Sequence, residues 1–300
     1  MTEQRAPEWQ VWTALWIVYI VWGSTYLGIR VLVETVPPLL STGARFICAG
    51  AVIWLVVLAR GGRAAARPTR RQVAAGALVG AFLIPGATGL IAIAESHGAP
   101  SSYAALIFAT IPLWVVLLRR ATGERPARQA YVGVAVGYAG VALLLGGGQR
   151  PAGVALGSAV LLLVAALSWS VGSVWSRHLP APDDAALTTA LTTTCGGMLA
   201  LLAGTLRGEW SDLQLSAISG RSIAAFAYLV LIGSAVGFSA FVWLVHHAPI
   251  SRVTTYAYVN PVVAIVLGRI AFDEPIPAVA LAGAVIVIGS VAVVVRAEPG

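Results

Sequence analysis

The stretch Thr254-Thr255-Tyr256-Ala257-Tyr258-Val259-Asn260-Pro261-Val262-Val263-Ala264-Ile265-Val266-Leu267-Gly268 is apolar enough to lie in a bilayer, yet two tyrosines, an asparagine and a proline occupy its first half. Pro261 lacks an N–H and crowds the carbonyl of Ala257, so a helix here is bent or locally open. Tyr256 and Asn260 share one helix face, which should meet protein or water because bare polar groups are costly in hydrocarbon. This pattern is typical of a transport site, and also of a kinked helix whose tyrosines only pack against neighbours.

The chain repeats itself at an offset of 149 residues, the distance from Pro112 to Pro261. Further identical pairs at this offset are Gly23 and Gly172, Ser24 and Ser173, His97 and His246, Pro100 and Pro249, Arg120 and Arg269, Pro126 and Pro275, and Gly140 and Gly289. So many matches at one spacing indicate two copies of one unit, over residues 1–149 and 150–300.

The composition is that of an integral membrane protein. Hydrophobic residues make up 58% of the chain and charged residues 10%, whereas a soluble domain averages about 25% charged. Apolar runs of membrane-spanning length fall at 11–30, 38–59, 73–94, 100–118, 129–146, 153–175, 186–206, 222–243, 250–271 and 277–295. The first run has three tryptophans and no small-residue cleavage site, so it is expected to remain as a helix.

The net charge of +7 comes from 19 basic residues, all arginine, against 12 acidic ones. Most arginines fall in loops on the side of the N-terminus, which predicts that both termini are cytoplasmic. Because each repeat has an odd number of spans, the second is inverted relative to the first. The predicted fold is an all-α membrane protein of ten transmembrane helices arranged as two inverted five-helix repeats.

Several motifs carry a resemblance to a known family. They are Trp22-Gly23-Ser24-Thr25-Tyr26-Leu27-Gly28-Ile29-Arg30, Pro37-Pro38, Ala44-Arg45-Phe46, Ala94-Glu95-Ser96, Ala104-Ala105-Leu106-Ile107 with Pro112-Leu113, and Tyr256-Ala257-Tyr258-Val259-Asn260-Pro261. Together they resemble the EamA family of the drug/metabolite transporter superfamily. The resemblance implies a ten-helix basket in the inner membrane of a bacterium, with a central cavity lined mainly by helices 1, 3, 4, 6, 8 and 9. It also implies an exporter of amino acids or other metabolites.

The two repeats differ at the positions expected to line this cavity. Ile107 and Ile111 stand where the second repeat has Tyr256 and Asn260. One wall, with Phe108 and Pro112, is therefore apolar, and the other is polar, which suits an amphipathic solute. The candidate substrate-binding residues are Trp22, Ser24, Thr25, Tyr26, Phe108, Pro112, Trp169, Ser173, Tyr256, Tyr258, Asn260 and Pro261. For the aromatic residues, core packing is the competing interpretation.

Arg45 is the one charge that lies plainly inside a span, and Glu95 lies near the end of another. We expect the two to meet as an ion pair that braces the outer mouth. The alternative is a gating or coupling role in which Glu95 titrates or meets the substrate. No metal-ligand spacing and no cofactor motif is present in the sequence.

The predicted function is a secondary transporter that exports small amphipathic, amino-acid-like metabolites by alternating access. Broad efflux of drugs or quaternary ammonium compounds is an alternative, since Trp22, Phe108 and Trp169 suit such solutes. A non-transporting scaffold or receptor is the alternative from another class. No nucleophile–base pair falls within a span, so an enzyme is not expected. Expected partners are a small-molecule substrate, membrane lipid and protons, without nucleic acid, in a monomer or homodimer.

Overall fold

The computed structural model describes residues 7–65, 67–146, 156–248, 253, 255–273 and 278–297, and all regular structure in these ranges is helical. The first half contains α1 (Glu8–Leu32), α2 (Pro38–Ala65), α3 (Arg70–Leu83), η1 (Ile84–Gly89), α4 (Leu90–Ser96), α5 (Ser101–Phe108), α6 (Ile111–Ala121) and α7 (Arg128–Gly146). The second contains α8 (Leu156–Ser176), α9 (Ala185–Leu206), η2 (Leu215–Ala217), α10 (Gly220–Tyr228), η3 (Leu229–Val236), α11 (Gly237–His247), α13 (Tyr256–Phe272) and α14 (Ala278–Ala297).

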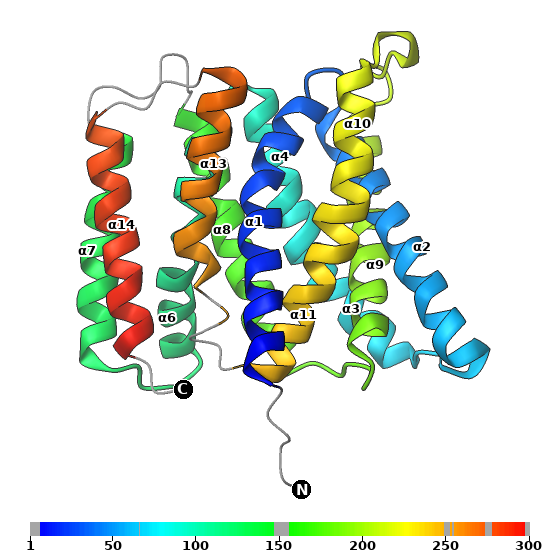
Figure 1. Cartoon of the computed structure of the whole chain (residues 1–300), viewed down its shortest axis with the longest axis horizontal. Helices are drawn as coiled ribbons and strands as arrows, with labels where there is room; N and C mark the ends of the chain where they lie inside the picture. The colour runs from blue at the N-terminus through cyan, green and yellow to red at the C-terminus, as the bar shows by residue number, and fades with distance from the viewer. Residues whose placement is uncertain are drawn as a thin grey trace, which may run out of the picture.

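The long helical segments stand side by side in one bundle and alternate in direction (Figure 1). The start of α1 and the end of α14 lie at the same end of the bundle, while α2 begins at the opposite end (Figure 1). Helices α7 and α14 pack against each other at one edge, away from the middle of the bundle (Figure 1). These two helices, which the resemblance does not place among those lining the cavity, therefore lie at the periphery of the bundle.

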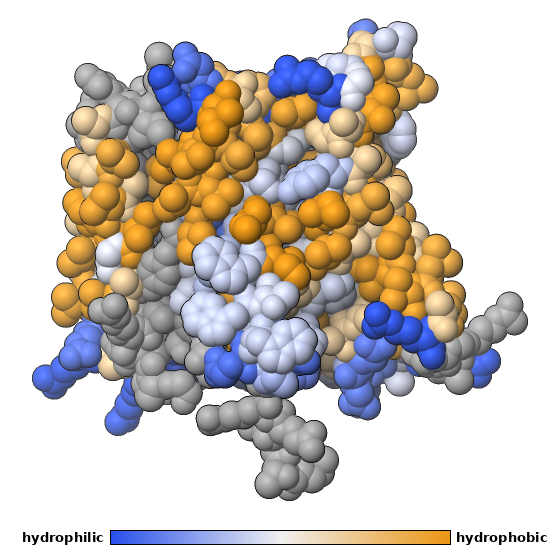
Figure 2. Space-filling model, in the orientation of Figure 1, coloured by the Kyte–Doolittle hydropathy of each residue, from blue (hydrophilic) through white to orange (hydrophobic). Residues whose placement is uncertain are grey.

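Seven helical segments of the described residues are long and apolar enough to cross a membrane. They are Glu8–Leu32, Pro38–Arg60, Arg70–Ser96, Ser101–Ala121, Leu156–Ser176, Ala185–Leu206 and Gly220–Val245, with shorter apolar helices at Val259–Phe272 and Leu281–Ser290. Figure 2 shows hydrophobic residues across the middle of one face and hydrophilic residues toward its two ends. The protein is thus an all-helical, multi-pass membrane protein, and the count of ten spans stays a prediction.

Close helix contacts occur where the sequence has glycine. A Cβ added at Gly23 of α1 would lie 2.6 Å from Cβ of Val263 in α13, so these two helices approach as closely as only glycine allows. A Cβ at Gly140 of α7 would lie 3.1 Å from the carbonyl oxygen of Gly283 in α14. These glycines therefore allow close packing between helices.

Two π-helical turns interrupt corresponding segments of the two repeats. The first, η1, joins α3 to α4, and the second, η3, joins α10 to α11. The two overlap when the chain is shifted by 149 residues, because Ile84 of η1 then falls on Gly233 of η3. The sequence analysis missed both turns, although Pro85 lies in η1 and removes one backbone donor there. Such turns are rare and occur often at functional sites.

The two prolines that first indicated the repeat have different effects. In the first repeat the helix ends at Phe108 and a new one begins at Ile111, with Pro112 in its first turn. In the second repeat α13 continues through Pro261. The helix is therefore interrupted just before Pro112 and continuous through Pro261, where the expected bend stays a prediction.

A carboxylate from a distant loop closes the start of α2. Oε2 of Glu209 accepts hydrogen bonds from the backbone N–H groups of Leu39 and Leu40, at 2.9 and 3.0 Å. These groups have no partner within their helix, and a negative charge there also complements the helix dipole. Glu209 is buried, and the sequence analysis did not single it out. At the start of α9, the corresponding helix of the second repeat, Asp184 caps its own helix through the N–H of Ala186.

Candidate functional site

An aromatic cluster fills the middle of the bundle, and Trp22 of α1 lies at its centre. The Trp22 ring centroid lies 5.4 Å from Trp169 of α8, 5.4 Å from Phe238 and 4.9 Å from Phe241 of α11, and 5.5 Å from Tyr256 of α13. Most of these pairs meet edge to face, the favoured geometry for aromatic rings. The cluster joins helices from both repeats.

The first repeat adds two more rings at the edge of this cluster. Phe108, the last residue of α5, lies 5.7 Å from Trp169 and 6.2 Å from Tyr26, which is one helical turn from Trp22. The structure therefore brings together Trp22, Tyr26, Phe108, Trp169 and Tyr256, which the sequence analysis had selected from four separate segments.

Phe238 and Phe241 belong to the same cluster and were missed. They are three residues apart on one face of α11, just after η3, and this spacing is the signal that was available. Phe238 also contacts Phe46 of α2, with ring centroids 5.4 Å apart. The cluster thus extends from α13 to α2 through α11.

Arg45 lies beside the aromatic cluster, inside the bundle. Its side chain is 4% exposed, and its guanidinium carbon lies 4.7 Å from the centroid of the Phe46 ring. Its Nε donates a 2.8 Å hydrogen bond to Oγ of Ser234 in η3. A Cβ added at Gly233 would lie 3.3 Å from Nη2 of Arg45, so the bare backbone of η3 makes room for the guanidinium.

Glu95 lies at the end of α4 and is fully buried. Its carbonyl oxygen accepts a 2.6 Å hydrogen bond from Nη1 of Arg30 in α1. The carboxylate acts on the charge of Arg45, but the ion pairs among the described residues do not include Arg45 with Glu95. The expected direct pair is therefore replaced by the bond of Arg45 to Ser234, because η3 rather than α4 presents an acceptor to Nε.

The hydroxyl groups of α1 are held within their own helix. Oγ of Ser24 donates to the carbonyl of Val21 at 2.8 Å and lies 2.5 Å from the hydroxyl of Tyr228 in α10. Oγ1 of Thr25 donates to the carbonyl of Trp22 at 2.7 Å. Ser24 thus remains an acceptor for Tyr228, and the methyl group of Thr25 faces Gly233. These contacts tie α1 to the segment that carries η3.

Asn260 joins α13 to α1. With its amide nitrogen turned toward the neighbouring carbonyls, it donates to the carbonyl of Tyr256 at 3.2 Å and to that of Tyr19 at 3.1 Å. Its side chain is 5% exposed. The polar face expected on this helix therefore meets protein, and its amide donors go to backbone oxygens. The side chain of Tyr258 lies outside the described part of the structure.

Ser173 and Pro112 lie near the cluster without joining its ring contacts. Ser173 follows Trp169 by one turn of α8, and its Oγ is buried without a hydrogen-bond partner among the described residues. Pro112 is buried in the first turn of α6. Beside it, Oγ of Ser170 in α8 lies 3.3 Å from the carbonyl of Ile111. These contacts place both residues where α8 crosses the break between α5 and α6.

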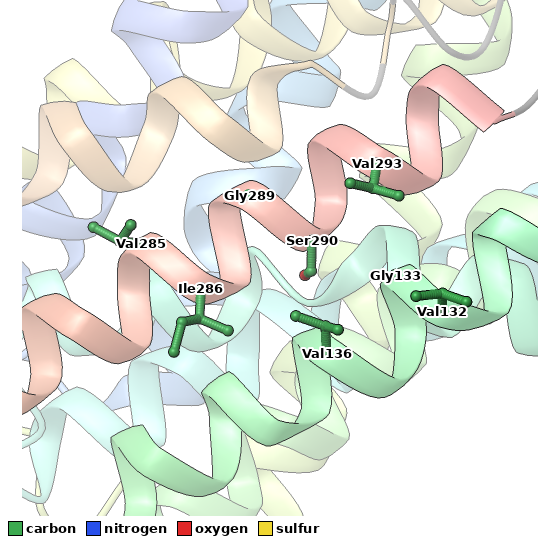
Figure 3. A pocket seen from close by; sticks show the side chains of 8 residues that line it. All are labelled: Val132, Gly133, Val136, Val285, Ile286, Gly289, Ser290 and Val293. Atoms are coloured by element: carbon green, nitrogen blue, oxygen red, sulfur yellow. The ribbon is translucent and has the colours of Figure 1, made fainter.

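Two hollows among the described residues lie away from the aromatic cluster. One is a groove of about 240 Å³ between α7 and α14, lined by Val132, Gly133, Val136, Val285, Ile286, Gly289, Ser290 and Val293 (Figure 3). The other is a recess of about 40 Å³ between α3, α8, α9 and the turn that precedes α9. Neither includes Trp22, whose ring is buried together with those of Trp169, Phe238 and Tyr256.

Comparison with known proteins gives a consistent result. The model of the EamA-like transporter family matches residues 11–146 and again residues 156–296. The "Uncharacterized inner membrane transporter YedA" of Escherichia coli (strain K12) is 35% identical over 259 residues, which cover 85% of this chain and 80% of that protein. A "Probable amino-acid metabolite efflux pump" of the same organism is 26% identical over 90% of both chains.

Two further similarities extend over nearly the whole chain. The "Probable terminal-alkyne amino-acid exporter" of Streptantibioticus cattleyicolor is 27% identical, over 97% of this chain and 94% of that protein. A solved crystal structure aligns with a TM-score of 0.66 and 23% identity, covering 96% of this chain and 98% of the other. The latter shows the shared fold.

Proposed function

The chain belongs to the EamA-like transporter family, and from this premise we propose that it exports small amphipathic, amino-acid-like metabolites across the inner membrane of a bacterium by alternating access. The observation that carries the proposal is the aromatic cluster around Trp22, which joins both repeats and lies beside the buried cation Arg45. A solute with an apolar part and a charged part fits such a combination.

The contacts of the cluster support alternating access. Trp22 holds helices of both repeats together, so the repeats cannot separate at this level while the rings are packed. A solute that replaces ring contacts with its own apolar surface would release one side and keep the other closed. In inverted-repeat transporters, substrate sites lie at such interfaces near the middle of the membrane.

The names of relatives agree with an amino-acid-like substrate. Two of them carry names of amino-acid export, and they align with this chain over nearly its full length. Efflux of quaternary ammonium compounds fits less well, because the buried guanidinium of Arg45 repels cations from the aromatic cluster. The role of a scaffold or receptor does not account for the paired π-turns or for the aromatic cluster that joins the two repeats.

Counterflow in proteoliposomes tests the function. Vesicles loaded with unlabelled L-leucine should accumulate labelled L-leucine faster than empty vesicles, whereas vesicles loaded with tetraphenylphosphonium should show no such exchange for that cation. Trp22→Ala should abolish the exchange, while Trp16→Ala on the outer face of the same helix, where the ring is 55% exposed, should leave it intact. Exchange of tetraphenylphosphonium without L-leucine would favour drug efflux instead.

The orientation and organisation belong to the same proposal. We place both termini in the cytoplasm, divide the repeats at residues 149 and 150, and take a monomer or homodimer, surrounded by lipid and with protons as coupling ion, as the working form. In a variant with Cys48 and Cys195 replaced by Ala, a cysteine at Thr122 should resist an impermeant thiol reagent in intact cells. One at Ser211 should react, and the reverse result would invert the topology.

A further inference from the structure

We propose that Arg45 is the anchor for a carboxylate group of the substrate, which makes a free carboxylate part of what this transporter recognises. The inference rests on the proposed function and deepens it, because it assigns one chemical group of the solute to one side chain. Ser234 acts as a positioning residue, since it holds Nε and makes no hydrogen bond to the two Nη groups.

The first argument is the unused hydrogen-bonding capacity of a buried cation. A guanidinium has five N–H donors, and the described residues provide one acceptor for Arg45, Oγ of Ser234 at 2.8 Å. Both Nη groups lack a hydrogen-bond acceptor among the described residues, although the side chain is only 4% exposed. Buried charges are normally paired and fully hydrogen-bonded. The carboxylate of Glu95 acts on the charge of Arg45 without bonding to it, so the Nη donors are the part of this arrangement that lacks an acceptor.

The second argument is the shape of the surroundings. A Cβ added at Gly233 would lie 3.3 Å from Nη2 of Arg45 and 3.0 Å from Cγ2 of Thr25, so the missing side chain makes room for both groups beside the π-turn backbone. The planar fork of arginine matches a carboxylate through two parallel N–H···O bonds. Ser234 bonds to Nε alone, so the edge formed by the two Nη groups is the one on which such a pair would form.

The third argument is the position of the apolar surface. Phe46 contacts both Arg45, at 4.7 Å, and Phe238, at 5.4 Å, and Phe238 in turn contacts Trp22. A solute with its carboxylate on Arg45 would therefore place an adjacent apolar group among these rings. An amino acid with an apolar side chain has both the carboxylate and the adjacent apolar group. The corresponding amine has only the apolar group.

The other repeat has no equivalent anchor. The residue 149 positions after Arg45 is Thr194, and the residue 149 positions before Ser234 is Pro85. The contact between α2 and η3 thus carries a cation with an acceptor, while the matching contact between α9 and η1 carries neither. Of these two matched contacts, only the one at Arg45 offers a carboxylate an anchor, which would fix the orientation of the solute along the bundle.

A matched pair of ligands tests the inference. L-leucine and isopentylamine differ only in the carboxylate, and their binding to the purified full-length protein can be measured by scintillation proximity with labelled compounds. Arg45→Gln should weaken L-leucine binding at least tenfold and change isopentylamine binding less than twofold. Arg207→Gln, which removes an exposed arginine at the end of α9, should leave both unchanged.

Two further variants keep the charge and guard against misfolding of Arg45→Gln. Arg45→Lys preserves the cation and loses the fork, so it should retain part of the preference for L-leucine. Ser234→Ala removes the acceptor of Nε and should weaken L-leucine binding severalfold, again without effect on isopentylamine. Each variant is compared by its monodispersity on size-exclusion chromatography.

The outcomes separate the inference from the proposed function. If L-leucine exchanges in proteoliposomes but Arg45→Gln and Arg45→Lys weaken both ligands equally, Arg45 is structural and the inference fails while the function stands. If folded Arg45→Gln still prefers L-leucine over isopentylamine, the inference also fails. If neither ligand binds the wild-type protein and L-leucine does not exchange, the proposed function fails with it.

Discussion

Two contacts correspond to each other in the two repeats, that of α2 with η3 and that of α9 with η1. They are formed by side chains of different chemical kinds. In the first, Arg45 reaches across to Ser234 over the ring of Phe46. In the second, a Cβ added at Gly196 of α9 would lie only 2.6 Å from Cδ1 of Ile84, so backbone and apolar atoms meet directly. Repetition of the fold therefore does not impose repetition of its chemistry.

The difference bears on how each contact can open. A contact of close-packed apolar atoms is stabilised by dispersion attraction between its atoms, and it offers no group that binds a charged ligand. A contact that holds a cation with free donors changes its energy when an anion arrives. If Arg45 binds the substrate, we expect the α2 side of the bundle to be the side where the substrate alters the balance between conformations.

The largest effect is expected at the centre of the aromatic cluster. Trp22→Ala should lower the free energy of unfolding by about 3–5 kcal/mol, the usual cost of removing a large buried aromatic side chain. Its counterpart, Val171, is only partly buried, and Val171→Ala should cost about 1 kcal/mol. Thermal unfolding in detergent measures both, and equal shifts would mean that Trp22 does not join the two repeats.

The caps of α2 and α9 offer the next comparison. Glu209→Ala strands the N–H groups of Leu39 and Leu40 inside the protein and should cost about 2–3 kcal/mol, since hydrogen bonds to a charged group are strong. Asp184→Ala at the start of α9 leaves exposed N–H groups that water can reach, so about 1 kcal/mol is expected. A larger loss for Asp184→Ala in thermal unfolding would contradict the importance of the distant cap.

Asn260 and its counterpart Ile111 test whether the polar wall binds substrate or holds helices. Asn260→Ala leaves the carbonyl of Tyr19 without its donor and should cost about 1–3 kcal/mol of stability. If the polar wall also binds substrate, Asn260→Ala should weaken L-leucine binding by about 1–3 kcal/mol, and Ile111→Ala should change binding much less. Equal losses of binding in two folded variants would place the binding site elsewhere.

The smallest effect is expected for Tyr256→Phe. The change keeps the ring contacts with Trp22 and Phe241 and removes only the hydroxyl, so the loss of stability should be below about 1 kcal/mol. Its counterpart in the first repeat is already apolar, as Ile107. A much larger loss in thermal unfolding would show that the hydroxyl has a structural partner, and a selective loss of L-leucine binding would place it in the site.

The sequence predicted the repeat, the membrane class and the family because these depend on composition and spacing. It also predicted the residues Trp22, Tyr26, Phe108, Trp169 and Tyr256, since aromatic residues near helix breaks in two repeats converge when the repeats pack. It did not predict the partner of Arg45, because Ser234 lies 189 residues away and faces Arg45 only through the geometry of η3.

The π-turns and the cap by Glu209 were missed for a related reason. A π-turn arises when one extra residue is accommodated in a helix by its tertiary surroundings, and apolar periodicity alone does not distinguish it from an α-helix. Glu209 lies in a loop where a single acidic residue carries no local signal, and its role depends on where α2 begins in space. Both features depend on how segments that are distant in the sequence pack against each other.

The π-turn η3 has a consequence for how the length of this segment can vary. An α-helix advances 100° per residue, because it has 3.6 residues per turn. Because the π-turn accommodates one extra residue, deleting one residue from Leu229–Val236 would let the segment relax to an α-helix while the helix beyond it keeps its facing relative to α10. Deleting one residue from the regular helix α10 would instead turn Phe238 and Phe241 away from Trp22 by about 100°, so the loss of one codon is tolerated within η3 and dismantles the aromatic cluster when it falls just before it.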